Sequence, residues 1–116
     1  MTLTRIDIID ETYIRASPEA IRAYFDDGAV CGVLWPHLTL DLVRDRGTKG
    51  LRWRVGGHIV GEMEVWIEPF WDGAIVHHYV RGDAARTADP EVGSRHRLRW
   101  KRAVHALKDC LEQPSG

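Results

Sequence analysis

The junction between residues 13 and 27 constrains the fold of this chain more than any other segment. An alternating strand pattern over residues 3–15 runs directly into Ser17, where a helix begins. Ser17 is a strong N-cap because its hydroxyl can accept from a free amide of the first turn. Pro18 suits the first helical position, where its missing N–H costs nothing. We therefore predict a strand, a helix over residues 18–26, and a short helical turn over 30–34 that ends before the Trp35-Pro36 pair.

The segment between residues 38 and 81 is typical of an antiparallel meander. Apolar and polar residues alternate over 38–43, 51–55, 59–68 and 74–81, and turn signals at 45–47, 56–57 and 70–73 separate these runs. In the register that we predict for the last two strands, which brings opposite charges together, these residues face each other: Ile67 and Val76, Val65 and His78, Glu64 and Tyr79, Met63 and Val80, Glu62 and Arg81. This register places His78 on the inner face of the sheet and His77 on the outer face.

A long helix is predicted at the C-terminal end. Asp89-Pro90-Glu91 repeats the cap, proline and acid order seen at Ser17, so we expect the helix to begin there. Its apolar stripe consists of Trp100, Val104, Leu107 and Leu111. Residues 82–89 read as a polar loop, in which 83–88 could hide a strand fragment. A helix of about 20 residues is about 30 Å long, enough to cross a curved sheet of this size.

Composition narrows the class of protein. The 116 residues predict a single domain over 1–113 and a disordered tail over 114–116. A net charge of −1 gives no general attraction to nucleic acid or to an anionic membrane. Cys31 and Cys110 are far apart and read as reduced, buried thiols. With no signal-peptide pattern and no membrane-length apolar run, we expect a cytoplasmic protein.

Two segments resemble a known superfamily. The stretch Ile14-Arg15-Ala16-Ser17-Pro18-Glu19-Ala20 through Phe25 resembles the opening of the START-related superfamily, which includes birch-pollen-allergen-like proteins, polyketide cyclases and lipid-transfer domains. The stretch Trp100–Asp109 is similar to the last helix of small bacterial members described as polyketide cyclase/dehydrase. The resemblance implies an α+β helix-grip fold. In this fold a curved antiparallel sheet of five to seven strands wraps around a long C-terminal helix, and two short helices follow the first strand.

The resemblance also implies a pocket between the sheet and the long helix, with a small hydrophobic or aromatic ligand. Only five strands are clear here, so a shallow cavity is expected, which argues against a large lipid. The predicted ligand-binding residues are Trp35 (near one rim), Trp53, Met63, Val65, His78, Trp100 and Val104. The same large side chains could equally well fill a core. In that case the chain would be a non-enzymatic interaction or dimerisation protein.

His78 and Asp10 are the candidates for chemistry. A histidine on the inner face could act as a general acid or base, and Asp10 could orient it, as in a cyclase or dehydratase. The alternatives are a hydrogen-bonded structural histidine and a buried carboxylate paired with an arginine. No nucleotide-binding fingerprint or nucleophile elbow occurs, so no cofactor is predicted.

Three other groups of residues have plain explanations. The six histidines lack ligand spacing, so a metal site is not expected. The basic cluster of Arg95, Arg97, Arg99, Lys101 and Arg102 reads as a solvated helix face rather than a nucleic-acid site. On the predicted outer face, beside Glu62, Glu64 and Glu68, the aromatic pair Trp66 and Tyr79 would suit a homodimer contact.

Overall fold

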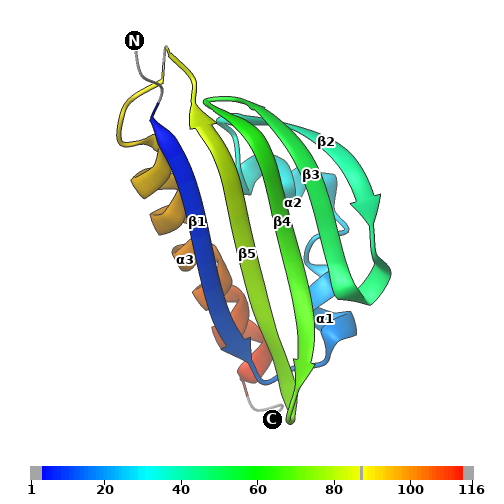
Figure 1. The fold of residues 1–116 in the computed structure, drawn as a ribbon. Coiled ribbons are helices and arrows are strands. Elements are labelled where there is room, and N and C mark those ends of the chain that lie inside the picture. The colour runs from blue at the N-terminus through cyan, green and yellow to red at the C-terminus, as the bar shows by residue number, and fades with distance from the viewer. Residues whose placement is uncertain (1–3, 87, 114–116) are drawn as a thin grey trace.

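The computed structural model describes residues 4–86 and 88–113. Its elements follow the predicted order: β1 (Arg5–Ile14), α1 (Pro18–Ala23), α2 (Gly28–Leu34), β2 (Leu38–Asp45), the 3₁₀ turn η1 (Gly47–Lys49), β3 (Gly50–Gly57), β4 (Ile59–Phe70), β5 (Gly73–Ala84) and α3 (Val92–Glu112). The strands form one antiparallel sheet with the order β1-β5-β4-β3-β2. Figure 1 shows the curved sheet with α1, α2 and α3 on one side of it.

The predicted register of β4 and β5 is confirmed. Val65 lies opposite His78 and Glu64 lies opposite Tyr79, so the inner and outer faces are as expected. The predicted hairpin between β3 and β4 is present, but its turn lies one residue later than expected: Gly56 and Gly57 still belong to β3, and the chain turns at His58. Gly57 has φ +88°, a conformation that favours glycine. These two features set which side chains of the meander face α3.

Helix boundaries differ from the expectation at several points. The Ser17 hydroxyl accepts from the amide of Ala20 at 3.1 Å, as predicted, but α1 ends at Ala23 and residues 24–26 form turns. The predicted start of α3 is wrong: the helix begins at Val92, and Glu91 is its N-cap. The Asp89 carboxylate instead accepts from the amide of Glu91 at 2.8 Å, which closes a turn ahead of the helix.

The remaining expectations have mixed outcomes. β5 continues to Ala84, so residues 82–84, expected in a loop, belong to the sheet, and the described residues contain no sixth strand. Cys31 is buried, but the prediction for Cys110 is wrong, because this residue is exposed. The tail at 114–116 lies outside the described residues, and the single-domain assignment stays a prediction. None of the described helices is long and apolar enough to cross a bilayer.

Candidate functional site

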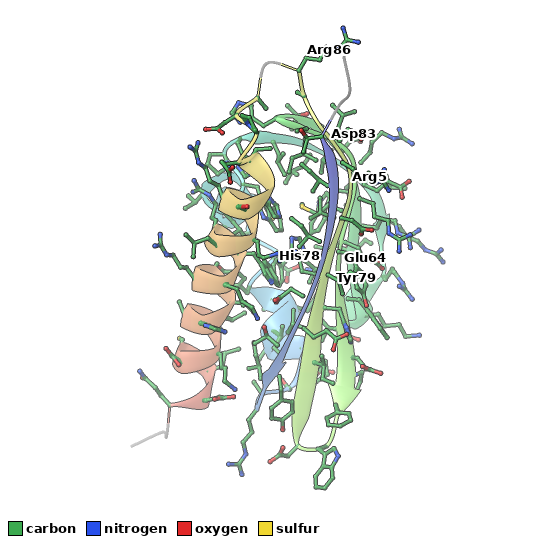
Figure 2. All side chains as sticks on the ribbon, turned by 60° about the vertical axis from the view of Figure 1, so that its left-hand side comes forward. Arg5, Glu64, His78, Tyr79, Asp83 and Arg86 are labelled. Atoms are coloured by element: carbon green, nitrogen blue, oxygen red, sulfur yellow. The ribbon has the colours of Figure 1, made fainter. Side chains whose placement is uncertain are left out.

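An aromatic cluster occupies the space between the sheet and α3. Trp35 follows α2, Trp53 lies on β3, His78 on β5, and His96 and Trp100 lie one turn apart on α3, all at most 5% exposed. Figure 2 shows His78 on the side of the sheet that faces α3, with Glu64 and Tyr79 on the opposite side. The cluster is where the helix-grip fold places its interior.

Trp35 is the centre of this cluster and not a rim residue, which corrects the expectation. Its ring is nearly parallel to those of His78, His96 and Trp100, at interplanar angles of 15°, 2° and 13°, and it meets Trp53 edge-on at 5.4 Å between centroids. Its indole N–H is buried and has no hydrogen-bond partner among the described residues. An unpaired buried donor costs about 1–3 kcal/mol. The ring contacts of Trp35 therefore stabilise the interior but leave its N–H unsatisfied.

Three histidines form a hydrogen-bonded chain through the interior. His78 Nδ1 lies 3.0 Å from the Glu64 carbonyl, His78 Nε2 lies 2.9 Å from His96 Nε2, and His96 Nδ1 lies 3.3 Å from His37 Nε2. A carbonyl can only accept, so His78 carries its proton on Nδ1. If all three rings are neutral, His96 must then donate to His78, and His37 must donate to His96. The chain therefore has one direction, from half-buried His37 to the backbone of β4.

Burial keeps the inner two rings neutral. It lowers the pKa of His78 to about 4, although the Glu64 carbonyl and the charge of Asp10 act in the opposite direction. It lowers the pKa of His96 to about 2, and proximity to His78, His37 and Arg99 adds to the effect. The pKa of His37 is lowered too, first by burial and then by Arg99 and His58. At neutral pH the interior thus holds a polar chain without charge.

Asp10 lies beside this chain and is held by α3. Its carboxylate contacts Lys101 Nζ at 2.7 Å and accepts from the Trp100 indole at 2.9 Å and from Thr12 at 3.2 Å. The expected arginine partner is therefore wrong, because the cation is Lys101. Burial raises the pKa of Asp10, but the bonds from Lys101 and Trp100 outweigh it and leave the pKa below its usual value. Asp10 is the register partner of His78, without a direct hydrogen bond between them.

The residues predicted to line a pocket are brought together, but they touch one another. All seven are at most 5% exposed: Trp35, Trp53, Met63, Val65, His78, Trp100 and Val104. Their contact with a ligand stays a prediction. Sequence reasoning missed His37, His96 and Lys101. For His96 a signal existed, because Val92, His96, Trp100 and Val104 recur every four residues and form one buried stripe.

A groove lies on the surface between α2 and α3. It has a volume of about 500 Å³ and is lined by Tyr24, Asp27, Val30, Val33, Leu34, Arg99, Arg102 and Ala103. Val33 is 76% exposed, although its neighbour Leu34 is buried and directly precedes Trp35. The groove therefore combines apolar side chains of α2 with two arginines of α3, next to the segment that carries Trp35.

The other sequence candidates are now placed. No group of three or more potential ligands among the described residues could hold a metal ion. In the basic cluster, Lys101 pairs with Asp10 and Arg95 with Asp89. Trp66 and Tyr79 lie on the outer face as predicted, but His77 stacks between them, 4.2 Å from the Trp66 ring.

Comparisons with known proteins support the fold. No protein-family profile matches, and no curated protein matches. The Aha1 dimer from Colwellia psychrerythraea is 18% identical and has a TM-score of 0.71, with 96% of this chain and 99% of that chain covered. A protein from Rhizobium loti is 12% identical with a TM-score of 0.70 over 92% and 99% of the two chains. One from Deinococcus radiodurans is 18% identical with a TM-score of 0.66 over 90% and 99%. The chain has the α+β helix-grip fold, with a curved five-stranded sheet and a long C-terminal helix.

Proposed function

We propose that the protein binds a small, flat aromatic or apolar molecule between the sheet and α3, and that Trp35 moves aside to admit it. The observation behind the proposal is the buried indole N–H of Trp35, which has no partner among the described residues. A ligand ring can replace the indole against His78, His96 and Trp100, and the displaced N–H regains a hydrogen bond with water. Because the slot is filled by one indole, the fitting ligand has one or two fused rings.

The segment that carries Trp35 is suited to movement. α2 is seven residues long, with the sequence GAVCGVL, and it has no charged residue in its first or last turn. Gly28 and Gly32 each disfavour a helix by about 1 kcal/mol relative to alanine, and a helix this short is not stable on its own. The groove between α2 and α3 gives an apolar molecule a place to bind first, at Val33 and Leu34.

An enzyme of the polyketide cyclase or dehydratase kind is the second candidate. It is favoured by the position of His78, which is the register partner of Asp10 and ends a chain of histidines that begins at half-buried His37. For neutral His78 to accept a proton from a bound substrate, its Nε2 must first give up the hydrogen bond that it accepts from His96. The negative charge of Asp10 would then stabilise the imidazolium that forms. His78 is fully buried, so this chemistry also requires Trp35 to move.

Calorimetric titration with 1-naphthol tests the binding. We expect the wild-type protein to bind it, and Trp35→Ala to bind at least about tenfold more tightly, because no side chain has to be displaced. Trp71→Ala is the matched control, since Trp71 is 90% exposed at the β4–β5 turn, and it should bind like the wild type.

Binding by Trp35→Ala alone would contradict the proposal. It would mean that the interior is simply filled by its own side chains, as in a non-enzymatic interaction protein. If a bound polyketide-like compound is converted, loss of turnover with retained binding in His78→Gln would favour the enzyme.

A further inference from the structure

The two edges of the sheet are protected to different degrees. Along β1, Lys101 and Lys108 of α3 reach across to Asp10 and to the Tyr13 carbonyl, which Lys108 contacts at 2.8 Å. β2 is the other edge, and among the described elements it pairs only with β3. Figure 1 shows β2 at the margin of the sheet, on the side away from α3. An unprotected edge strand can pair with another strand.

The side chains of β2 are unusually apolar for an edge strand. Leu38, Leu40 and Leu42 occupy the inner face, where Leu40 lies opposite Val55 and Leu42 opposite Trp53. Leu38 and Leu40 are only partly buried, and Leu42 is 52% exposed. A bulge between Leu42 and Arg44 interrupts the ladder after this stretch. Bulges limit edge pairing, so the regular part of the edge is residues 38–42.

We propose that β2 pairs with β2 of a second copy of this chain, antiparallel and with Leu40 on the two-fold axis. In an antiparallel pair, opposite residues point to the same face of the sheet. A two-fold axis between two residues would set an inner-face residue opposite an outer-face residue. The axis of a symmetric pair must therefore pass through a residue. Centring on Leu40 sets Leu38 opposite Leu42 of the second copy on the inner face, and Thr39 opposite Asp41 on the outer face. The three leucines of each strand then cover one another.

The registers shifted towards the bulge are less favourable. Centring on Asp41 sets two carboxylates directly opposite each other, which is destabilising. Centring on Leu42 brings the bulge at Val43 into the ladder. The Leu40 register avoids both faults, and it lets the Thr39 hydroxyl donate to the Asp41 carboxylate on both sides of the axis.

The contact is short, so the dimer is expected to be transient. Stable interfaces bury roughly 800 Å² on each partner, more than five residues of strand edge supply. We therefore expect association in the micromolar range of protein concentration. The outer face at Trp66 and Tyr79, which the sequence suggested, is a weaker candidate because His77 already stacks between these rings.

Sedimentation velocity across the micromolar range tests the interface, with no ligand added, so its outcome does not depend on the proposed function. Thr39 is exposed, so its substitutions leave the core intact. Thr39→Asp should weaken the dimer about tenfold, because it places like charges opposite Asp41 twice. Thr39→Lys should tighten it several-fold. The double variant Thr39→Asp/Asp41→Lys should recover the lost affinity and bind about as tightly as Thr39→Lys, since it has the same charge pair reversed.

Ser94→Asp, on an exposed position of α3, should have no effect. A wild-type protein that stays monomeric throughout the series would overturn the proposal. Dimerisation that is insensitive to Thr39→Asp would overturn it as well, and failure of the double variant to recover would reject the Leu40 register. Thermal unfolding of each variant confirms that a lost dimer is not a lost fold.

Discussion

His77 and His78 are neighbours in the chain and are both buried, yet the two faces of the sheet surround them with different groups. His78 is fully buried and contacts a backbone carbonyl and His96. His77, 6% exposed, has the Glu68 carboxylate 3.0 Å from Nε2 and the Glu11 carboxylate 3.5 Å from Nδ1. One ring depends on buried neutral partners, and the other on charged partners at the surface.

The difference shows that exposure alone does not decide what a histidine contributes. The side chains of Glu11 and Glu68 are 59% and 39% exposed, so they can turn to water if His77 is lost. His96 and the Glu64 carbonyl have no such alternative in the interior. We therefore expect the inner face to respond strongly to acid and to substitution, and the outer face to respond weakly.

Acidification should have the largest effect. Below about pH 6.5 the unfolded chain binds protons on both His78 and His96, whereas the folded chain leaves His78 neutral down to a pKa of about 4 and His96 to about 2. The unfolded state thus binds more protons, and the free energy of unfolding falls as the pH falls. Between about pH 6.5 and 4, His78 alone accounts for a loss of about 3 kcal/mol, and His96 adds to it.

Urea unfolding at a series of pH values measures this loss. The double variant His78→Leu/His96→Leu should flatten the pH dependence in that window, while His77→Leu should leave most of it in place. An equally steep profile in the double variant would show that carboxylates, not the buried histidines, govern acid unfolding.

Single substitutions of the two histidines should have the next largest effect on the free energy of unfolding. His78→Leu leaves the donor of His96 and the Glu64 carbonyl unpaired in the interior, which should cost about 2–4 kcal/mol. His77→Leu should cost about 1 kcal/mol or less, because its partners are hydrated. Urea unfolding at pH 7 compares the two variants, and equal losses would refute the contrast between the faces.

The outer and inner faces of the β4–β5 hairpin could be predicted from the sequence because strand alternation and cross-strand charge are local signals. They place His78 inward without any knowledge of the rest of the chain. The buried stripe on α3 is also a local signal, and it includes His96, which sequence reasoning missed. The presence of a hairpin next to Gly56-Gly57 is a local signal as well, although the turn itself falls at His58.

The interior arrangement depends on contacts between distant segments, which single-sequence patterns do not encode. Trp35 reaches the centre because the loop after α2 turns inward, and nothing in the local pattern distinguishes this path from a rim position. The His37–His96–His78 chain joins a loop, a helix and a strand. Asp10 pairs with Lys101, 91 positions away along the chain, because α3 crosses β1 at that point.

Substitutions in ion pairs should change the free energy of unfolding least. They should still cost more on the inner face of the sheet than on the outer face. Lys101→Met removes the cation at 2.7 Å from the Asp10 carboxylate, whose side chain is only 10% exposed, and should cost about 1–2 kcal/mol. Arg81→Met removes an outer-face partner of Asp7 at 3.9 Å, with both side chains more than half exposed, and should cost less than about 0.5 kcal/mol. Urea unfolding in low and high salt checks both. The Arg81 loss should vanish in salt, whereas most of the Lys101 loss should persist, because its partner Asp10 is mostly buried and a partly buried pair is screened less. If salt removed both losses alike, Asp10 would belong with the solvated charges of the outer face.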